Sequence, residues 1–286
     1  MSKGKIVNAR LSIDTIKANM LEDKVVVITG GGGVLCGQFA RYFGALHAKV
    51  AVLDLNKESA DIVASDITKN GGTAIGVEVN VLASDSLKKA HDEVVSKLGA
   101  CDILINGAGG NHRKGTTSKE YFEKVQLDQP DLTTFFDLDA EGIGFVFNLN
   151  FLGTLLPTQE FAKDLIDYGG NIINISSMNA FTPLTKIPAY SGAKAAVSNF
   201  TQWLAVHFSR VNIRVNAIAP GFFLTDQNRT LLTKQDGSLT ERGNTIISQT
   251  PLGRFGKPED LNSTLEWLCK EESSFVTGVV IPVDGG

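Results

Sequence analysis

The feature that most constrains the fold is a repeated alternation of short β-branched runs and helical patterns. Strand-like runs lie at 24–29, 48–53, 74–79, 102–106, 171–176, 213–217 and 276–283, and helical patterns lie at 33–45, 57–69, 84–98, 137–167, 188–210 and 258–270. Continuous apolar runs are typical of strands buried on both faces. Because such alternation requires right-handed crossovers, the sequence predicts an α/β fold: a doubly wound, open parallel sheet with helices on both faces.

The sequence also predicts how the chain is divided. No internal repeat and no linker rich in Pro or Ser interrupts it, so we expect a single domain over 23–286 after a short N-terminal extension, 1–22. Two long segments, 107–136 and 221–250, follow predicted strands. Loops of that length in a compact domain are usually functional, so we expect them to form the substrate site.

Composition excludes several classes of protein. The chain is 43% apolar and 20% charged, with a net charge of −4, whereas a general nucleic-acid binder normally has a basic domain. No run reaches the ~18 apolar residues of a membrane-spanning helix, and 1–20 lack the apolar core of a secretory signal. We therefore expect a cytoplasmic protein with no nucleic-acid or membrane partner. The three cysteines are far apart and no two histidines have ligand spacing, so no metal is expected.

A glycine-rich turn follows the first predicted strand. It reads Thr29-Gly30-Gly31-Gly32-Gly33 and opens a helix, while Asp54 ends the second strand 24 residues after Gly30. Glycines let the backbone approach a pyrophosphate, and a helix N-terminus offers free N–H groups. An acidic residue at the place of Asp54 binds ribose hydroxyls in dinucleotide folds. The alternative is a tight turn and a capping Asp, but strand, turn and helix in this order favour a nucleotide site.

Tyr190 and Lys194 form a second constellation. They are four residues apart on a predicted helix, so their side chains share a face. A phenol has a pKa of ~10, and a nearby ammonium favours the phenolate and lowers that pKa. The pair could therefore act as a general acid and base near neutral pH, although the spacing alone can also arise by chance.

Together these features resemble the short-chain dehydrogenase/reductase family over Lys24 to Gly286. The resemblance is carried by the turn and Asp54, and by Asn106-Gly107-Ala108-Gly109, Asn150-Phe151-Leu152-Gly153, Ile175-Ser176-Ser177, Tyr190 with Lys194, Asn216, and Pro220-Gly221, all in the family's order and spacing. It implies a Rossmann-type, NAD-dependent oxidoreductase that acts on CH–OH groups and assembles as a homotetramer.

The resemblance also implies roles for single residues. Tyr190 would exchange the proton and Ser177 would orient the substrate oxygen. Lys194 would bind the nicotinamide ribose and lower the pKa of Tyr190, and Asn150 would hold a water that relays protons. The implied NAD contacts are Gly30, Gly32, Gly33, Val34, Leu35, Asp54, Leu55, Asn80, Val81, Asn106, Ala108, Gly109, Tyr190, Lys194, Pro220, Gly221, Phe223 and Thr225. The carboxylate of Asp54 would repel the 2′-phosphate of NADP and so select NAD.

The sequence departs from the family pattern at three of these places. Val34 and Cys36 stand where the turn usually has its second and third glycines, so we expect a shifted contact pattern with binding retained. Asn80 stands where an Asp commonly contacts the adenine amino group, and an amide oxygen could accept the same hydrogen bond.

A closer resemblance is to a branch of sugar-acid dehydrogenases that interconvert D-mannonate and D-fructuronate. It is carried by 30–35, 111–112, 147–153, 177–181 and 220–225. Candidate substrate residues are Asn111, His112, Arg113, Asn179 and Arg229, because amides and cations suit a polyhydroxy carboxylate and Arg can grip a carboxylate with two bonds. The alternatives are solvated loop charges, a gluconate or other polyol dehydrogenase, and a nucleotide-binding protein without catalysis.

Overall fold

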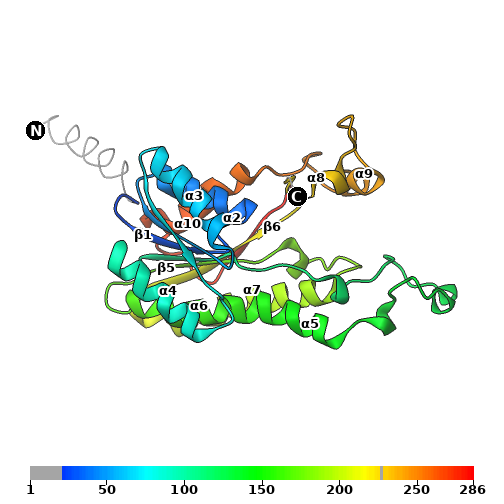
Figure 1. Cartoon of the computed structure of the whole chain (residues 1–286), viewed down its shortest axis with the longest axis horizontal. Coiled ribbons are helices and arrows are strands. Elements are labelled where there is room, and N and C mark those ends of the chain that lie inside the picture. The colour runs from blue at the N-terminus through cyan, green and yellow to red at the C-terminus, as the bar shows by residue number, and fades with distance from the viewer. Residues whose placement is uncertain (1–20, 226–227) are drawn as a thin grey trace, which may run out of the picture.

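The computed structural model describes residues 21–225 and 228–286, which build a seven-stranded, all-parallel sheet between two helical layers (Figure 1). The strands are β1 (Val25–Thr29), β2 (Lys49–Asp54), β3 (Thr73–Glu78), β4 (Ile103–Asn106), β5 (Gly170–Ile175), β6 (Ile213–Pro220) and β7 (Val280–Val283). Their order in space is β3-β2-β1-β4-β5-β6-β7. The predicted Rossmann-type α/β fold is confirmed.

The strand order places a switch point between β1 and β4. β2 and β3 are added on one side of β1, and the chain then crosses over to add β4 on the other side. Thr29 is therefore in register with Leu53 of β2 and with Asn106 of β4. In open parallel sheets the crevice outside the carboxyl ends of strands at such a point is where ligands bind.

Alternate residues of the strands point to opposite faces of the sheet and belong to two separate hydrophobic cores. Val26 and Ile28 of β1 pack under α2 (Val34–Ala45), α3 (Lys57–Lys69) and α10 (Asn262–Cys269). Val25 and Val27 face the opposite layer, which contains α4 (Ser84–Lys97), α5 (Ala140–Phe147), α6 (Gly153–Phe161) and α7 (Pro188–His207). Figure 1 shows these two layers above and below the sheet. All five β1 residues are buried, which explains the uninterrupted apolar run.

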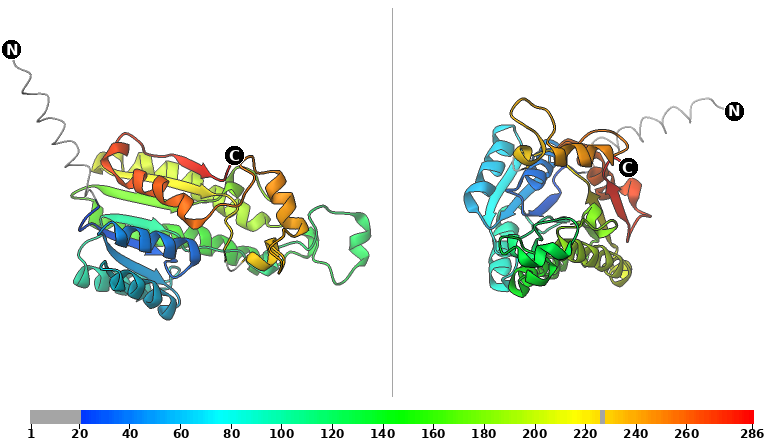
Figure 2. Two further views of the ribbon diagram at one scale, coloured as in Figure 1. Left: turned by 90° about the horizontal axis from the view of Figure 1, so that it is seen from above. Right: turned by 90° about the vertical axis from the view of Figure 1, so that its right-hand side faces the viewer.

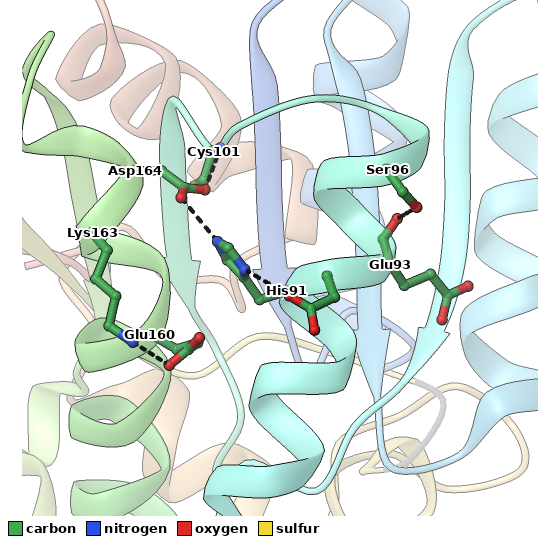
Figure 3. Close-up of polar contacts among 8 residues, drawn as sticks. His91, Glu93, Ser96, Cys101, Glu160, Lys163 and Asp164 are labelled. Carbon is green, nitrogen blue, oxygen red and sulfur yellow. Dashed lines mark hydrogen bonds and ion pairs between the residues drawn. The ribbon is translucent and has the colours of Figure 1, made fainter.

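A partly buried polar contact holds the second layer together (Figure 3). His91 on α4 points toward Asp164 of the short helix η5 (Ala162–Leu165), with 2.9 Å between Nε2 and Oδ1. The other oxygen of Asp164 accepts a hydrogen bond from the N–H of Cys101 at 2.8 Å, just before β4. The carboxylate thus ties α4 and β4 to the end of α6, the same helical layer that carries Asn150.

Two predicted elements differ in extent. The predicted helix over 137–167 begins at Ala140 and is interrupted by a π-helical segment, η4 (Asn148–Leu152). The strand predicted from Val276 begins only at Val280, because Gly278 has a φ of +79° and bends the chain before it. Most of the predicted N-terminal extension lies outside the described residues; Leu21 is buried against the first core.

The two predicted substrate loops also differ from expectation. The segment 221–250 contains α8 (Arg229–Leu232) and α9 (Glu241–Ser248). Of the loop 107–136, only the first part stays on the body. The rest, 118–137, projects away from it (Figures 1 and 2) and is called the arm below. The arm makes its own local contacts, and the assignment of the whole loop to a substrate site stays a prediction.

In the described part of the chain, no helix is long and apolar enough to cross a membrane. Over the same residues, no group of three or more His, Cys, Asp or Glu side chains is placed to hold a metal ion.

Candidate active site

The glycine-rich turn is pressed against the segment that follows β4. Gly30 has a φ of +66°, and a Cβ there would lie 2.9 Å from both the N and Cα atoms of Ala108. The Thr29 hydroxyl accepts hydrogen bonds from the N–H groups of Gly107 and Ala108, at 3.1 and 3.2 Å. Thr29, which was absent from the predicted cofactor residues, therefore locks the two turns together at the switch point.

Asp54 faces the same turn. One carboxylate oxygen accepts a hydrogen bond from the Gly32 N–H at 3.0 Å, and the other accepts from the N–H of Asn56. A Cβ on Gly32 would lie 2.7 Å from the Cβ of Ser59, whereas around Gly33 the nearest atom is the carbonyl oxygen of Gly30 at 3.1 Å. The backbone of Gly32 and Gly33 therefore carries no side chains beside the Asp54 carboxylate. This arrangement fits a pyrophosphate at the glycines and a ribose hydroxyl at Asp54.

The replacements at Val34 and Cys36 are accommodated by packing. Val34 is the first residue of α2 and is 36% exposed. Cys36 is buried, and its sulfur lies 2.1 Å from where a Cβ on Gly107 would be. Burial raises the pKa of the Cys36 thiol to about 12. The thiol is therefore a neutral packing group that fills the space over Gly107, which has to be glycine. Leu35 packs against the first core.

Four more predicted cofactor residues lie near the glycine-rich turn or on the strands beside it. Leu55 is 70% exposed beside Asp54, and Val81 is buried against Gly153. The Asn80 side-chain oxygen accepts a hydrogen bond from the Leu82 N–H at 3.0 Å, which leaves one lone pair for a ligand. The Asn106 amide points into the core, so the predicted cofactor contact of Asn106 would be made through its backbone. The amide donates to Thr158 and to Asn174, both at 2.9 Å, since a buried amide requires partners.

The segment after β6 lies at the same edge of the sheet. Gly221 packs on Asp284, with 2.6 Å between the site of a Cβ and the Asp284 Cα. Phe223 is buried with its ring on Gly256, and the Thr225 N–H donates to the Asn228 side chain at 2.8 Å. Pro220 is the buried last residue of β6. Gly221, Phe223 and Thr225 therefore lie just beyond the carboxyl end of β6, and their contact with the cofactor stays a prediction.

Asn150 is held at the π-helical segment and is fully buried. Its side-chain N–H₂ donates to the carbonyl oxygens of Gly110 and Val146, at 2.7 and 2.8 Å, and its oxygen accepts from the Gly110 N–H at 3.2 Å. Single-turn π segments occur often at functional sites. Gly110 was missed by the sequence analysis, although it directly follows the Asn-Gly-Ala-Gly motif.

Lys194 reaches the same place from α7. Its ammonium donates to the Ile175 carbonyl oxygen at 2.7 Å. A Cβ on Gly109 would lie 2.6 Å from the Asn150 oxygen and 3.2 Å from the Lys194 nitrogen, so the two side chains converge on this glycine. Burial lowers the pKa of Lys194 to about 8. The ammonium form still dominates at neutral pH.

Tyr190 and Ser177 complete the group. Burial raises the pKa of Tyr190, and the hydrogen bond from Ser177 opposes that rise. The Lys194 nitrogen lies 5.6 Å from the centroid of the Tyr190 ring. The role of Lys194 in lowering the pKa of Tyr190 stays a prediction, and in this structure the pKa of Tyr190 lies above its usual value. Desolvation of the phenol outweighs the interaction with Ser177, and the ammonium is held by Ile175.

Asn179 lies beside Ser177 and has one unsatisfied atom. Its backbone N–H donates to the Ser177 hydroxyl at 3.2 Å. Its side chain is 6% exposed, and among the described residues its amide oxygen has no hydrogen-bond partner. A buried acceptor without a partner is costly, so a donor from a ligand or water is needed there.

The other predicted substrate residues occupy the first part of the loop after β4. The His112 ring lies 5.3 Å from that of Phe145 and accepts a hydrogen bond from the Lys114 N–H. Asn111 donates to Thr116 at 2.9 Å. The Lys114 ammonium is 3.1 Å from Asp139, whereas Arg113 is exposed and has no ion pair within 21–225 and 228–286. The last candidate, Arg229, begins α8 and is exposed.

Comparisons with known proteins agree with this arrangement. The family described as short chain dehydrogenase matches residues 24–236. An uncharacterized oxidoreductase of Haemophilus influenzae is 57% identical over 93% of each chain. The uncharacterized oxidoreductase UxuB of Bacillus subtilis is 50% identical over 93% of this chain and 95% of its own. A solved Haemophilus structure with bound NAD, described as a candidate D-mannonate oxidoreductase, superposes with a TM-score of 0.89 at 56% identity, covering 93% of this chain and 95% of its own.

Proposed function

The chain belongs to the short-chain dehydrogenase family, and on that premise we propose that it is an NAD-dependent oxidoreductase that interconverts D-mannonate and D-fructuronate. One observation carries the catalytic part of the proposal. Asn150 and Lys194 converge on Gly109, and the Ser177 hydroxyl interacts with the Tyr190 phenol and opposes the rise of its pKa. The substrate follows from the similar Haemophilus structure that is described as a candidate D-mannonate oxidoreductase.

NAD rather than NADP suits the turn. The Asp54 carboxylate is fixed by two backbone N–H groups and faces Gly32. A second anion at this place, such as the 2′-phosphate of NADP, would be repelled. Gly30, Gly32 and Gly33 would hold the pyrophosphate, and Lys194 would hold the nicotinamide ribose. The similar Haemophilus structure contains NAD.

Proton transfer falls to Tyr190. The bound nicotinamide supplies or accepts the hydride. In the reducing direction Tyr190 donates its proton to the carbonyl oxygen, and its raised pKa keeps it protonated at neutral pH. Ser177 orients the same oxygen. Lys194 as an ammonium stabilises the phenolate that remains. The hydrogen bond from Asn150 to Gly110 keeps the neighbouring Gly109 against Lys194. Asn150 would also bind the water that returns a proton to Tyr190 through Lys194.

The carboxylate of the sugar acid would bind at the first part of the loop after β4. Among the residues that the structure describes, Arg113 is the cation there without an ion pair, since Lys114 is paired with Asp139. Asn111 and His112 add polar groups, Arg229 would approach from α8, and the Asn179 oxygen would accept a hydrogen bond from a substrate hydroxyl. An anionic substrate needs such a local cluster because the chain has a net charge of −4. A cytoplasmic location and a homotetramer belong to the same proposal.

A substrate panel tests the proposal. Purified protein is mixed with NADH and a series of keto-sugar acids, gluconate-type acids and matching neutral keto-sugars, and absorbance at the NADH band is followed. We expect fructuronate to be reduced best. Arg113→Ala should raise KM for the acid by ~10-fold or more, the scale of one charge-assisted contact, and should leave neutral sugars unaffected. Lys88→Ala, an exposed cation on α4, is the matched control.

Three results would contradict this assignment. Equal reduction of the acid and its neutral counterpart would remove the need for a carboxylate site. A silent Arg113→Ala variant would show that the loop does not bind the carboxylate. If the protein binds NADH but reduces none of the compounds, the result would indicate a nucleotide-binding protein without catalysis.

A further inference from the structure

We propose that Thr154 and Thr158 on α6 are positioning residues for Asn150. Their hydroxyl groups hold the π-helical segment η4 in the register that turns the Asn150 side chain toward Gly110. The observations that carry this are a continuous line of buried hydrogen bonds, an interrupted helix backbone beside it, and the anchor of the line on the sheet. The effect on turnover rests on the proposed function, whereas the positioning of Asn150 does not.

The two threonines belong to a line of hydrogen bonds along α5, η4 and α6, which follow one another in the helical layer below the sheet (Figure 1). The Asn150 side-chain amide donates to the Val146 carbonyl oxygen at 2.8 Å. The Thr154 hydroxyl donates to the Asn150 carbonyl oxygen at 2.9 Å, and the Thr158 hydroxyl donates to the Thr154 carbonyl oxygen at 2.8 Å. Each donor lies four residues after its acceptor, so all three contacts share one helix face. They are called the ladder.

The ladder lies where apolar side chains are expected. Asn150, Thr154 and Thr158 are at most 2% exposed, and the buried face of a helix is normally apolar. A threonine inside a helix can satisfy its hydroxyl with the carbonyl group four residues earlier, a contact that slightly destabilises and often bends the helix. Valine has nearly the same shape and needs no such partner. The hydroxyl groups at 154 and 158 therefore indicate a role other than packing.

The backbone beside the ladder is not a regular α-helix. The segment η4 is π-helical, so its N–H groups bond to carbonyl groups five residues earlier instead of four. Pro157 lies inside α6 and has no N–H to donate to the turn before it. Because an α-helical register would turn residue 150 to a different side of the helix, contacts that favour the π-helical register decide where the Asn150 amide points. The Thr154 hydroxyl makes such a contact, since it binds the Asn150 carbonyl oxygen.

The other end of the ladder is anchored on the sheet. The Thr158 hydroxyl accepts a hydrogen bond from the Asn106 side-chain amide of β4 at 2.9 Å. The same amide donates to Asn174 of β5, also at 2.9 Å. A shift of α6 along its axis would break the contact between Thr158 and Asn106. The ladder therefore ties the height of Asn150 to the end of β4, the strand that leads to Gly110.

At its catalytic end the ladder decides how Gly110 is held. The Asn150 amide donates to the Gly110 carbonyl oxygen at 2.7 Å, and its oxygen accepts from the Gly110 N–H at 3.2 Å. The same oxygen and the Lys194 nitrogen converge on Gly109. Rotation of Asn150 would release the Gly110 N–H and separate Asn150 from Lys194. The exchange rate of the Gly110 N–H therefore reports on the position of Asn150.

Thr154→Val tests the positioning directly, because it keeps the shape of the side chain and removes the hydroxyl. The readout is hydrogen–deuterium exchange of the Gly110 N–H, measured by mass spectrometry at single-residue resolution and compared with the β1 amides as reporters of global unfolding. We expect exchange at Gly110 to be faster by ~10-fold or more, the scale of one lost hydrogen bond. Thr154→Ser, which keeps a hydroxyl, should restore the natural rate.

Thr201→Val is the matched control. The Thr201 hydroxyl is also buried in a helix, α7, and donates to the Val197 carbonyl oxygen four residues earlier at 2.9 Å. It should leave exchange at Gly110 unchanged. Thr158→Val should act as Thr154→Val does, with a smaller effect, and it decides by the same criteria if Thr154→Val does not fold. Unchanged exchange in the valine variants of the ladder, equal acceleration in the control, or no restoration by serine would overturn the proposal.

Turnover gives a second measurement. With NADH and the sugar acid that is reduced best, kcat of Thr154→Val should fall by ~10-fold or more, since a misplaced group near the reacting atoms slows the chemical step. The KM for NADH should change by less than ~3-fold. An unchanged kcat would overturn the catalytic part of the proposal. If the natural protein reduces no sugar acid, the proposed function fails, and exchange at Gly110 still decides whether the ladder positions Asn150.

Discussion

The ammonium of Lys194 lies 5.6 Å from the centroid of the Tyr190 ring and donates to the Ile175 carbonyl oxygen at 2.7 Å. The side chain is thus anchored to a strand end and not to the phenol oxygen. Burial lowers the pKa of Lys194 to about 8 and raises the pKa of Tyr190. At neutral pH the site therefore holds a protonated phenol beside a charged amine, the form required to reduce a carbonyl.

Tyr190→Phe removes only the hydroxyl. Turnover should fall by ~100-fold or more, the usual scale for loss of a general acid, while NADH binding and the unfolding temperature stay near those of the natural protein. Stopped-flow fluorescence of NADH and steady-state rates measure the two properties separately. Retained turnover would exclude Tyr190 as the proton donor.

Lys194→Met should separate catalysis from stability. The pKa of Lys194 is about 8 in the folded chain and near 10.5 in the unfolded chain, so the unfolded chain binds more protons between these pH values. The free energy of unfolding therefore rises with pH over this window, and below about pH 8 the buried ammonium lowers it by the full amount. The shift corresponds to a cost on the order of 3 kcal/mol, partly offset by the hydrogen bond to Ile175. The variant should lose turnover and cofactor affinity, yet unfold at a higher temperature at pH 7.

The pH dependence provides the control for this variant. The stability difference between Lys194→Met and the natural protein should shrink as the pH rises from 8 to 10, since the natural protein then loses its buried charge. Calorimetry at several pH values measures it. A lower unfolding temperature of the variant at pH 7 would show that the ammonium is net stabilising.

Asp54→Ala should narrow the preference for NADH over NADPH. The change removes the carboxylate that repels a 2′-phosphate and leaves the Gly32 N–H free to bind it. We expect the ratio of kcat/KM for the two cofactors to change by ~10-fold or more, because removal of one close charge interaction is worth over 1 kcal/mol. Asp61→Ala on α3 serves as the matched control. An unchanged ratio would mean that another residue sets the preference.

Cys36→Gly restores the usual family residue and tests whether the thiol matters for binding. The change leaves a cavity over Gly107 and places glycine in the first turn of α2, so stability should fall by about 1–3 kcal/mol. NADH affinity should change by less than ~3-fold, an effect below 1 kcal/mol. Cys36→Ala separates the cavity from the backbone effect. A tenfold loss of affinity would show that the sulfur contacts the cofactor.

The layered fold was predictable because its signals are local. The β1 run is apolar from Val25 to Ile28 since both faces are buried, and the glycines directly after the strand open α2. Such periodicity depends on neighbouring residues alone. The same holds for the Tyr190–Lys194 spacing, which a single helix places on one face.

The polar core and the arm were not predictable in this way. Asn106 occupies a motif position, yet its amide turns inward because Asn174 and Thr158 are brought beside it by β5 and α6.

The sequence by itself determined the order of strands and helices, the glycine-rich turn and the identity of the candidate catalytic residues. Only the tertiary structure decided that Lys194 donates to Ile175, that Asn150 is hydrogen-bonded to Gly110, and that 118–137 projects away from the body. The physical reason is that side-chain direction and desolvation depend on groups far apart in the chain. Their effects on pKa and contact therefore arise only once the layers have packed.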